Sequence, residues 1–565
     1  MRIIRTTRHL FLPSKFKEVT RVCPDESSII ENSIQRIYPV VEPKKGSRCR
    51  RIRINYLLQF NLLCYASFQD KFIKLGSVFI LKINGRTLFF FIVFIIILLL
   101  TLSPINDPDF WWHLRTGQWV AENHTIPHTD PFSYTANGEE WVAHEWLSDL
   151  FIYSIYRLGG FGLLMLAFSL IILGTFLFIY FSCEPKSRTF AAGLVLLLGA
   201  AASLPLWGIR PQMISMLFTS LLIFLLERYQ QKRKKGYLIP IPILMLVWVN
   251  SHGGYLLGLG VLTIFIGGSL IDVLVDWIKH KDAGVNPQWN TILILCGTFL
   301  VSLAATLVNP YGLRILTYPF QTLTDSSMQQ FIVEWFSPDF HDAAMLPFAG
   351  LLMLLVLFGL LGSKRMPTVR ILLVLAFGFG ALTSVRHIPL FVVVVVPVLA
   401  GQISSVLNMR FSENKDSILS RLRLPEVLGV LLAAMLVFTF IRVSNKQSEV
   451  EETYFPKDAA DWVLQSGLEG NVFSSYTWGG YLIWKLYPQQ LVYIDGRMDV
   501  YSDDIVESYQ HIYYAYPDWR QLLDQSPTTL VLVEPDSELA VAMQETSTWG
   551  IVYQDTQSVI FSKHD

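Results

Sequence analysis

Charged residues are scarce in this sequence: only 16% of its 565 residues are Asp, Glu, Lys or Arg. A soluble protein carries about 25% charged residues. Cysteines are also few, five in all, and none forms a C-x-x-C pair, so we predict no disulfide framework. The formal net charge is zero, which gives no support to a nucleic-acid partner. Hydrophobic residues make up 52% of the chain, and this excess indicates an integral membrane protein.

Several common functional motifs are missing as well. The sequence contains no P-loop, no G-x-S-x-G or H-E-x-x-H pattern and no Gly-rich dinucleotide fingerprint. These absences argue against an ATP-driven pump and against the commoner classes of hydrolase. No secretory signal peptide precedes the first apolar run. We therefore expect residues 1–86 to be a basic, disordered cytoplasmic extension, or an upstream region translated from a wrongly chosen start.

Long apolar runs begin near residue 87. A membrane-spanning helix needs about 20 mostly apolar residues. Segments near that length lie at 87–103, 161–182, 189–206, 211–226, 254–275, 291–308, 344–362, 369–385 and 425–442, with shorter runs at 238–250 and 388–401. We predict a polytopic α-helical membrane domain of about eleven spans over residues 87–442.

The distribution of basic residues predicts the orientation of these spans. Successive loops alternate between rich and poor in Lys and Arg, and basic loops are retained in the cytoplasm. With a cytoplasmic N-terminus, the large first loop 104–160, the loop 309–343 and the tail 443–565 all lie on the outer side. We predict a multi-pass protein of the cytoplasmic (inner) membrane, in contact with the lipid bilayer and with its polar loops outside.

The tail 443–565 has the pattern of an extracytoplasmic α/β domain. A helix is predicted from Lys457 after Pro456, and further helices at 503–515, 518–524 and 537–545. Strands are predicted at 471–476, 491–495, 529–533, 550–554 and 558–562, the last two as a hairpin.

The stretch from Asp107 to Arg115, after the first span, is the most informative. Asp107 is suited to cap a helix that begins at Pro108, with Asp109 in its first turn and His113 on the same face. Two carboxylates this close can act as a base or bind a divalent cation such as Mg²⁺ or Mn²⁺, and Arg115 can pair with a phosphate. Capping alone also explains Asp107. The tryptophans at 111, 112 and 119 predict that the helix lies at the membrane interface.

Other polar residues lie at the outer ends of predicted spans. His144 and Glu145 are expected on a second interfacial helix, although a solvated helix face explains them equally well. Ionisable groups at membrane depth are unfavourable, by about 2.5–3.5 kcal/mol, which favours a function for them. The further candidates for substrate or phosphate binding are Arg210, His252, Glu334, Arg386 and His387. In the tail, Asp495 and Arg497 follow a predicted strand, where ligand contacts are common, and turn chemistry is the alternative.

This combination resembles the glycosyltransferase C (GT-C) superfamily. It is most similar, over residues 87–565, to bacterial polytopic proteins with an Asp-Pro-Asp-x-Trp-Trp-His-x-Arg-x-Gly loop and an Ile-Asp-Gly-Arg tail motif. A looser similarity links Asp107 and Asp109 to the acidic residue in the active site of oligosaccharyltransferase catalytic subunits. The segment from Ser475 to Tyr481 resembles their Trp-Trp-Asp-Tyr-Gly motif, which binds a peptide acceptor, but departs from it at residues 477 and 478.

The resemblance implies a glycosyltransferase that takes a sugar from a polyprenyl-phosphate or polyprenyl-diphosphate carrier at the outer membrane face, in the cell envelope. Asp107 or Asp109 would then activate an acceptor hydroxyl or bind the divalent cation. The groups expected to hold the carrier phosphate are Arg115, Arg210 and Arg386, and those expected to position substrates are His113, His144 and Glu145. Two alternatives stay open: a transporter or flippase for lipid-linked glycans, and a non-catalytic sensor or assembly protein.

Overall fold

The computed structural model describes residues 85–279, 289–324, 332–362, 366–407 and 424–564. The predicted N-terminal extension lies outside the described residues, apart from its last two, and so do the three cysteines that precede residue 85. Of the other two cysteines, Cys183 is buried, and both are free thiols.

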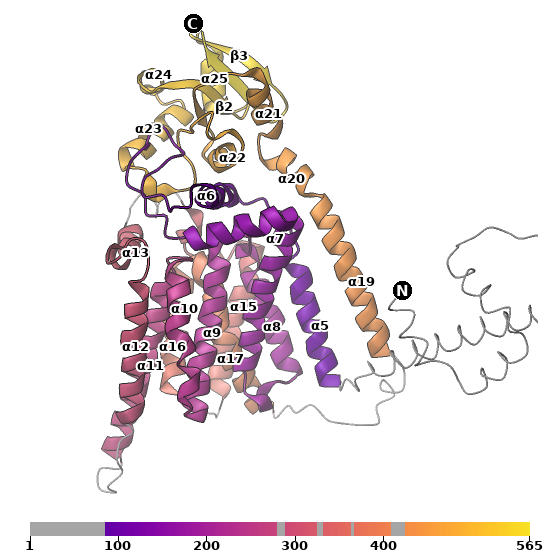
Figure 1. Cartoon of the computed structure of the whole chain (residues 1–565). Helices are drawn as coiled ribbons and strands as arrows, with labels where there is room; N and C mark the ends of the chain where they lie inside the picture. Colours follow the sequence, from indigo (N-terminus) through magenta and orange to yellow (C-terminus); the bar gives the residue numbers. More distant parts are fainter. Residues whose placement is uncertain (1–84, 280–288, 325–331, 363–365, 408–423, 565) are drawn as a thin grey trace, which may run out of the picture. The chain divides into compact units, whose positions relative to one another are not determined.

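A bundle of apolar helices forms the larger part of the described chain (Figure 1). Its helices are α5 (Gly85–Leu100), α7 (Trp146–Ser182), α8 (Phe190–Ser203), α9 (Pro211–Lys232), α10 (Pro240–Val249), α11 (Tyr255–Lys279), α12 (Trp289–Thr306), α15 (Leu346–Leu361), α16 (Thr368–Thr383), α17 (Ile388–Val406) and α19 (Leu424–Asn445). Helices α6 (Asp109–Asn123), α13 (Arg314–Thr324) and α20 (Gln447–Tyr454) belong to the connections at one end.

The number of spans differs from the prediction. Within the described residues, six helices are long and apolar enough to cross a membrane, or seven if the bent pair Val430–Asn445 and Gln447–Tyr454 forms one span. Four further apolar helices have 10–17 residues and overlap predicted spans, but they are shorter than the roughly 20 residues that a full crossing requires. The predicted total of about eleven spans is therefore not confirmed.

Helix α7 is broken near its middle. Gly159 (φ −159°, ψ 21°) and Gly160 (φ 62°, ψ −158°) leave the helical region, and a positive φ of this kind is favourable only for glycine. The segment before the break lies across the ends of the bundle helices in Figure 1, and the segment after it runs into the bundle. The sequence predicted both parts, an interfacial helix and a span over 161–182. However, α7 begins at Trp146, so His144 and Glu145 lie in the turn before it and not on the helix.

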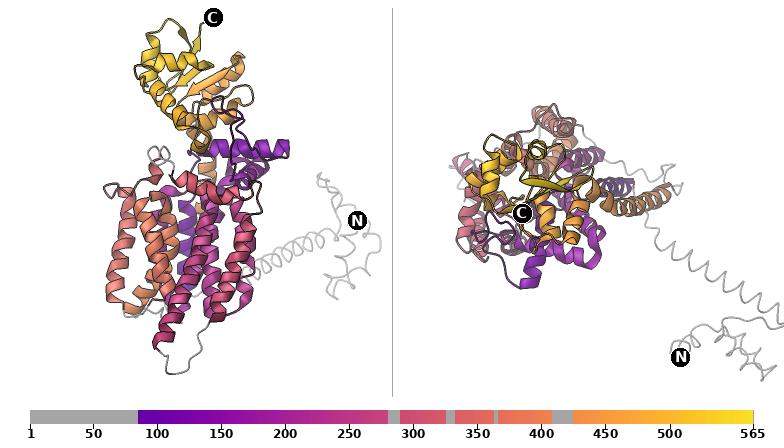
Figure 2. Two further views of the ribbon diagram at one scale, coloured as in Figure 1. Left: turned by 90° about the vertical axis from the view of Figure 1, so that its left-hand side faces the viewer. Right: turned by 90° about the horizontal axis from the view of Figure 1, so that it is seen from above.

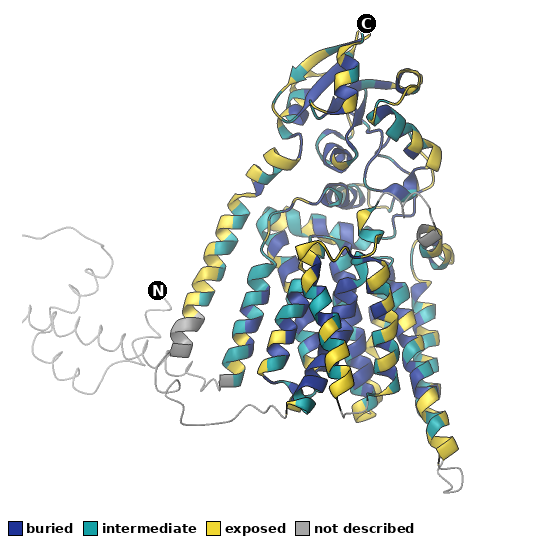
Figure 3. Ribbon diagram, turned by 180° about the vertical axis from the view of Figure 1, so that it is seen from behind, coloured by how far each residue is buried: buried dark blue, intermediate teal, exposed yellow. Residues whose placement is uncertain are grey.

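Helix α17 is the centre of the bundle. Its side chains are buried along almost its whole length, and it packs against α8, α15 and α16. The outer helices instead carry many exposed residues, as Figure 3 shows. Apolar side chains are among them, for example Met353 and Leu360 on α15, which are 74% and 82% exposed. Side chains this apolar are stable on the surface when hydrocarbon surrounds them, so these faces contact lipid.

The C-terminal region combines helices with one mixed sheet (Figure 2). The strands are β1 (Asn471–Ser474), β2 (Thr528–Val533), β3 (Trp549–Gln554) and β4 (Val559–Lys563), in the order β1-β2-β4-β3. The pair β1–β2 is parallel, and β2–β4 and the β3–β4 hairpin are antiparallel. The helices are α21 (Lys457–Ser466), α22 (Tyr476–Leu486), α23 (Asp503–Tyr513), α24 (Trp519–Gln525) and α25 (Glu538–Gln544).

Most tail elements match the prediction, but the strand expected at 491–495 is not formed. Val492 makes only isolated bridges, one to Val472 of β1 and one to Ser133 of loop 104–160. Val492 therefore lies between β1 and this loop and pairs with both. Helix α22 was not predicted, because its Gly479-Gly480 pair has low helix propensity.

Candidate active site

Nine of the predicted site residues form one connected cluster at the end of the bundle that carries α6. Each belongs to a segment that begins or ends a helix, so chain segments far apart in the sequence supply neighbouring side chains. The cluster consists of Asp107, Asp109, His113, His144, Glu145, Arg210, His252, Glu334 and Arg386.

Arg210 links loop 104–160 to the loop that precedes α15. It has an extended backbone just before Pro211, as expected for a residue that precedes proline. Its guanidinium donates to the carboxylates of Asp107 and Glu334. Burial disfavours the charged form of Arg210, but the two carboxylates have the larger effect and raise its pKa. Although burial opposes ionisation of Glu334, the charges of Arg210 and Arg386 bring its pKa below the usual value.

Asp107 also performs the predicted capping. Its carboxylate accepts a hydrogen bond of 3.1 Å from the backbone N–H of Asp109, and Pro108 has helical dihedral angles (φ −59°, ψ −36°). The side chain therefore has two partners, the α6 N-terminus and Arg210. Both are fixed by the fold, which gives the carboxylate a defined orientation.

Asp109 has a different environment. It is half-buried, it forms no ion pair with any residue that the structure describes, and its Oδ1 accepts a hydrogen bond of 3.3 Å from the indole of Trp112. Burial and the nearby charge of Asp107 raise its pKa from 3.8 to about 6, against the opposing charges of Arg210 and His113. A carboxylate with this pKa accepts a proton readily near neutral pH.

Three imidazoles surround Glu145. The Nε2 atoms of His113, His144 and His252 lie 3.7, 3.7 and 3.5 Å from its carboxylate oxygens. Burial raises the pKa of Glu145, despite the opposing positive charges around it, and lowers that of His113 and His252. Burial therefore favours the neutral forms in this group, which can exchange protons and hydrogen bonds with a bound ligand.

The other imidazole nitrogens have protein partners as well. His113 Nδ1 lies 2.6 Å from Oδ1 of Asp149, and burial raises the pKa of Asp149 well above its usual value, so either group can carry the proton between them. His252 Nδ1 instead accepts from the backbone N–H of Gly254 at 2.8 Å, so its Nε2–H points toward Glu145. Asp149 had no role assigned from the sequence, although its position four residues after Glu145 indicates neighbouring faces.

The C-terminal region covers this cluster. A Cβ atom at position 496 would clash with Oδ1 of Asp109, and one at position 480 would meet the carbonyl of Pro108 at 2.8 Å. The glycines of the Ile-Asp-Gly-Arg and Trp-Gly-Gly-Tyr segments thus allow the tail to approach the start of α6. Trp111 is fully buried against Phe455 and Tyr481 of the tail, and Trp112 is also buried. The expectation that these two rings anchor α6 in the lipid interface is therefore wrong.

Arg497 and Asp495 lie inside the protein. The Arg497 guanidinium donates to Asp495 at 2.8 and 2.6 Å and to Asp130 of the first outer loop at 2.6 Å. It also lies over the rings of Phe132 and Trp141, at 5.0 and 4.7 Å. The three charged groups are at most 1% exposed. This network joins the outer loop to the tail, and Asp130 was not identified from the sequence because its partner is 367 residues away.

Two further predicted residues have partners outside the cluster. Arg115 donates to Gln118 and to the carbonyl of Tyr487 in the tail, at 2.8 and 3.0 Å. His387 lies near the ring of Trp335, with ring centres 6.3 Å apart. The binding roles assigned to both stay predictions.

The described residues around Asp107 and Asp109 do not provide a complete set of ligands for the predicted cation. Among the described residues, no group of three or more His, Cys, Asp or Glu side chains is arranged to hold a metal ion. Arg210 already occupies Oδ2 of Asp107, and the indole of Trp112 contacts Oδ1 of Asp109. These residues do not fit a cation site by themselves, so we derive no step through a metal.

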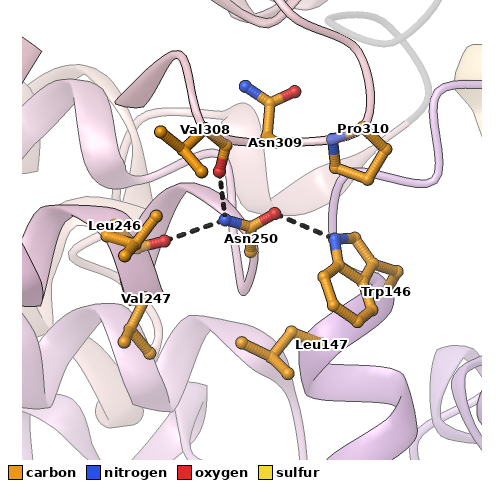
Figure 4. Close-up of a pocket in the computed structure, with 8 residues that line it drawn as sticks. All are labelled: Trp146, Leu147, Leu246, Val247, Asn250, Val308, Asn309 and Pro310. Atoms are coloured by element: carbon orange, nitrogen blue, oxygen red, sulfur yellow. Dashed lines mark hydrogen bonds between the residues drawn. The ribbon is translucent and has the colours of Figure 1, made fainter. Parts of the chain in front are cut away.

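A cavity of about 450 Å³ lies beside the turn that carries His252 (Figure 4). Asn250 donates to the carbonyls of Leu246 and Val308 and accepts from the indole of Trp146. Its polar groups therefore all have protein partners, and the remaining lining is mostly apolar, with Leu147, Val247, Asn309 and Pro310. The predicted acidic and basic residues do not line this cavity.

A scan against known protein families finds no matching family, and a search of curated proteins finds no match. Among solved structures, an oligosaccharyltransferase of Archaeoglobus fulgidus tethered with an acceptor peptide has 12% identity and a TM-score of 0.49, over 84% of this chain and 74% of that chain. ArnT from Cupriavidus metallidurans bound to undecaprenyl phosphate has 14% identity and a TM-score of 0.48, over 84% and 97%. The comparison shows structural similarity to GT-C enzymes at low sequence identity, and it concerns the fold alone.

Proposed function

We propose that this chain is a membrane glycosyltransferase that moves a sugar from a polyprenyl-phosphate-linked donor to an acceptor hydroxyl at the outer membrane face. The observation that carries the proposal is the environment of Asp109. Its carboxylate has a pKa near 6 and no ion-pair partner among the described residues, and it lies beside the ion-paired Asp107–Arg210. Transfer from a phosphate carrier requires a base for the acceptor hydroxyl and positive charge near the phosphate, and Asp109 meets the first requirement.

The reaction follows from these positions. Asp109 takes the proton of the acceptor hydroxyl as the hydroxyl oxygen forms a bond to the anomeric carbon of the sugar. The bond between that carbon and the phosphate oxygen breaks, and its electron pair stays on the carrier phosphate. A positive group near the leaving oxygen stabilises this developing charge. Proton and charge are both accounted for without a further reactant.

Arg386 is the better of the two guanidiniums for holding the carrier phosphate. Arg210 is already shared between two carboxylates. Arg386 forms no ion pair with any described residue and lies 5.3 Å from the centre of the Trp335 ring. The indole N–H of Trp335 is buried and has no acceptor within the described ranges, so it is a second donor for a phosphate or sugar oxygen. We assign to His113, His144 and Glu145 the positioning of the sugar hydroxyls.

The test is a transfer assay with the purified full chain, a labelled polyprenyl-phosphate sugar and extracted membrane acceptors. Asp109→Asn keeps the shape of the side chain but removes the base, and we expect transfer to fall by about 10²–10⁴-fold. Asp339→Asn is the matched control, because Asp339 is an exposed carboxylate of the loop that carries Glu334. Full transfer by Asp109→Asn would exclude Asp109 as the base. Flux of intact glycan without bond formation would instead favour a flippase.

A second arm addresses the donor and the predicted cation. We expect Arg386→Gln to raise KM for the donor more than it lowers kcat, since it removes a phosphate contact. Chelation of divalent cations before the assay tests whether Asp107 and Asp109 acquire a metal once substrate supplies further ligands. Unchanged donor KM in Arg386→Gln would remove this residue from the phosphate site.

A further inference from the structure

Three arginines come together at the other end of the bundle, away from α6. Arg86 lies in the first turn of α5, Arg188 in the connection between α7 and α8, and Arg228 in the last two turns of α9. In Figure 1 this is the lower end of the helices, opposite the C-terminal region. None of the three belongs to the site described above.

Their contacts bring the three positive charges close together. Arg188 and Arg228 both donate to the carbonyl oxygen of Phe181, at 3.1 and 2.7 Å. Arg86 donates at 3.1 Å to the carbonyl of Pro185, in the same connection as Arg188. No Asp or Glu in the described part of the chain forms an ion pair with any of them; Glu227, next to Arg228, pairs with Arg370 at 2.9 Å instead.

This arrangement is electrostatically unfavourable by itself. Burial lowers the pKa of the Arg188 guanidinium, and the charges of Arg228 and Arg86 lower it further, against the nearby Tyr180 and Cys183. Helix C-termini attract cations, so capping of α7 explains one arginine at the Phe181 carbonyl. It does not explain three, because the carbonyls of Phe181, Cys183 and Pro185 carry only partial charges and cannot neutralise three full ones. An anion between them would.

The donors that such an anion needs are present. A guanidinium has five N–H groups. Hydrogen bonds to other described residues use at most two of these N–H groups on each arginine. Aromatic rings hold two of the groups in place: Arg188 lies 4.5 Å from the centre of the Tyr180 ring, and Arg228 lies 5.0 Å from that of Phe224. Fixed, planar guanidiniums are well suited to phosphate oxygens.

The surroundings of the arginines favour a lipid over a soluble anion. Phe181 and Phe190, at the adjoining ends of α7 and α8, are 41% and 48% exposed. Apolar rings beside cations match the boundary between acyl chains and headgroups. The charge pattern of the loops predicts that this end faces the cytoplasm, where the leaflet is rich in anionic lipid.

We propose that Arg86, Arg188 and Arg228 form a binding site for the phosphate of an anionic phospholipid, with its acyl chains over Phe181 and Phe190. The lipid phosphate takes hydrogen bonds from guanidiniums of α5, the α7–α8 connection and α9, and so links three helices at this end.

The purified full chain in a zwitterionic detergent tests the site by native mass spectrometry, with phosphatidylglycerol and phosphatidylcholine added in turn. The variant is Arg86→Gln/Arg188→Gln/Arg228→Gln. The control, Lys232→Gln/Lys234→Gln/Lys235→Gln, removes the same charge from the same end. We expect phosphatidylglycerol to bind the wild type more tightly than phosphatidylcholine. We also expect the triple arginine variant to lose about tenfold or more of that affinity, with little change in the control.

Thermal unfolding of each variant shows whether it is folded. If the triple variant does not fold, the single variant Arg228→Gln is measured instead. In that variant the Phe181 carbonyl still accepts a hydrogen bond from Arg188. Equal losses in the arginine variant and the lysine control would overturn the proposal, as would equal binding of the two lipids. Displacement of phosphatidylglycerol by millimolar inorganic phosphate would show that the site takes a free phosphate and would also overturn it.

Discussion

Replacement of Arg497 by methionine should destabilise the protein more than any change of surface charge. The wild-type guanidinium makes two hydrogen bonds to Asp495 and one to Asp130, and all three side chains are buried. Methionine fills most of the volume but leaves two carboxylates without a counter-charge. Breaking a buried pair in this way costs about 3–5 kcal/mol. We expect a loss of that size in the free energy of unfolding.

The control is Lys485→Met on α22, which removes a partly exposed ion pair to Asp461 at 2.8 Å. Such pairs contribute at most about 1 kcal/mol. Chemical denaturation in detergent, followed by tryptophan fluorescence, measures both variants. The neutral triple variant Asp130→Asn/Asp495→Asn/Arg497→Met should recover part of the loss, because no buried charge remains. Equal stabilities of Arg497→Met and Lys485→Met would refute the reasoning. Normal stability with weakened donor binding would instead place Arg497 among the substrate contacts.

Four other predictions follow from the structure. Because Asp109 must be deprotonated to act, kcat/KM should rise with pH through about 6, the pKa that burial and Asp107 give it, and a midpoint near 4 would contradict this. The same raised pKa means that the folded chain binds this proton more tightly than the unfolded chain does. The stability that Asp109 contributes is therefore lost as pH rises from about 4 to 6. Asp109→Asn should melt at a higher temperature than wild type at pH 7 but not at pH 3. Gly496→Ala should reduce both transfer and melting temperature, since its methyl group meets Asp109, whereas Gly267→Ala, with open space around it, should reduce neither. Trp111→Ala should lower the free energy of unfolding by about 3–5 kcal/mol, since Trp111 is fully buried, whereas the half-exposed Trp277→Ala should not.

The elements that could be predicted from the sequence are those that local patterns determine. The apolar runs located the helices, among them the span over 161–182 that forms the second part of α7. The proline at 108 and the carboxylate of Asp107 marked the start of α6. In each case the evidence lies within a few residues of the feature.

The rest depends on contacts between distant segments. The sequence suggested that Asp107, Arg210 and Glu334 act at one place, but only the fold shows that Arg210 bridges the two carboxylates. It could not show that Arg497 pairs with Asp130, nor that Val492 pairs with both β1 and loop 104–160. Tryptophans next to a span suggested an interfacial belt. The tail that buries them begins more than 300 residues later in the chain, so their burial could not be read from the local sequence.

The contact between Gly496 and Asp109 has a consequence for biosynthesis. All helices of the bundle precede the tail in the chain, so they enter the membrane while the residues that cover Asp109 are still to be translated. A partly made chain thus has its carboxylates and guanidiniums open to water, which screens their charges. Only after residues 476–500 have been added and folded do Gly480 and Gly496 meet the start of α6 and shield Asp109 from water.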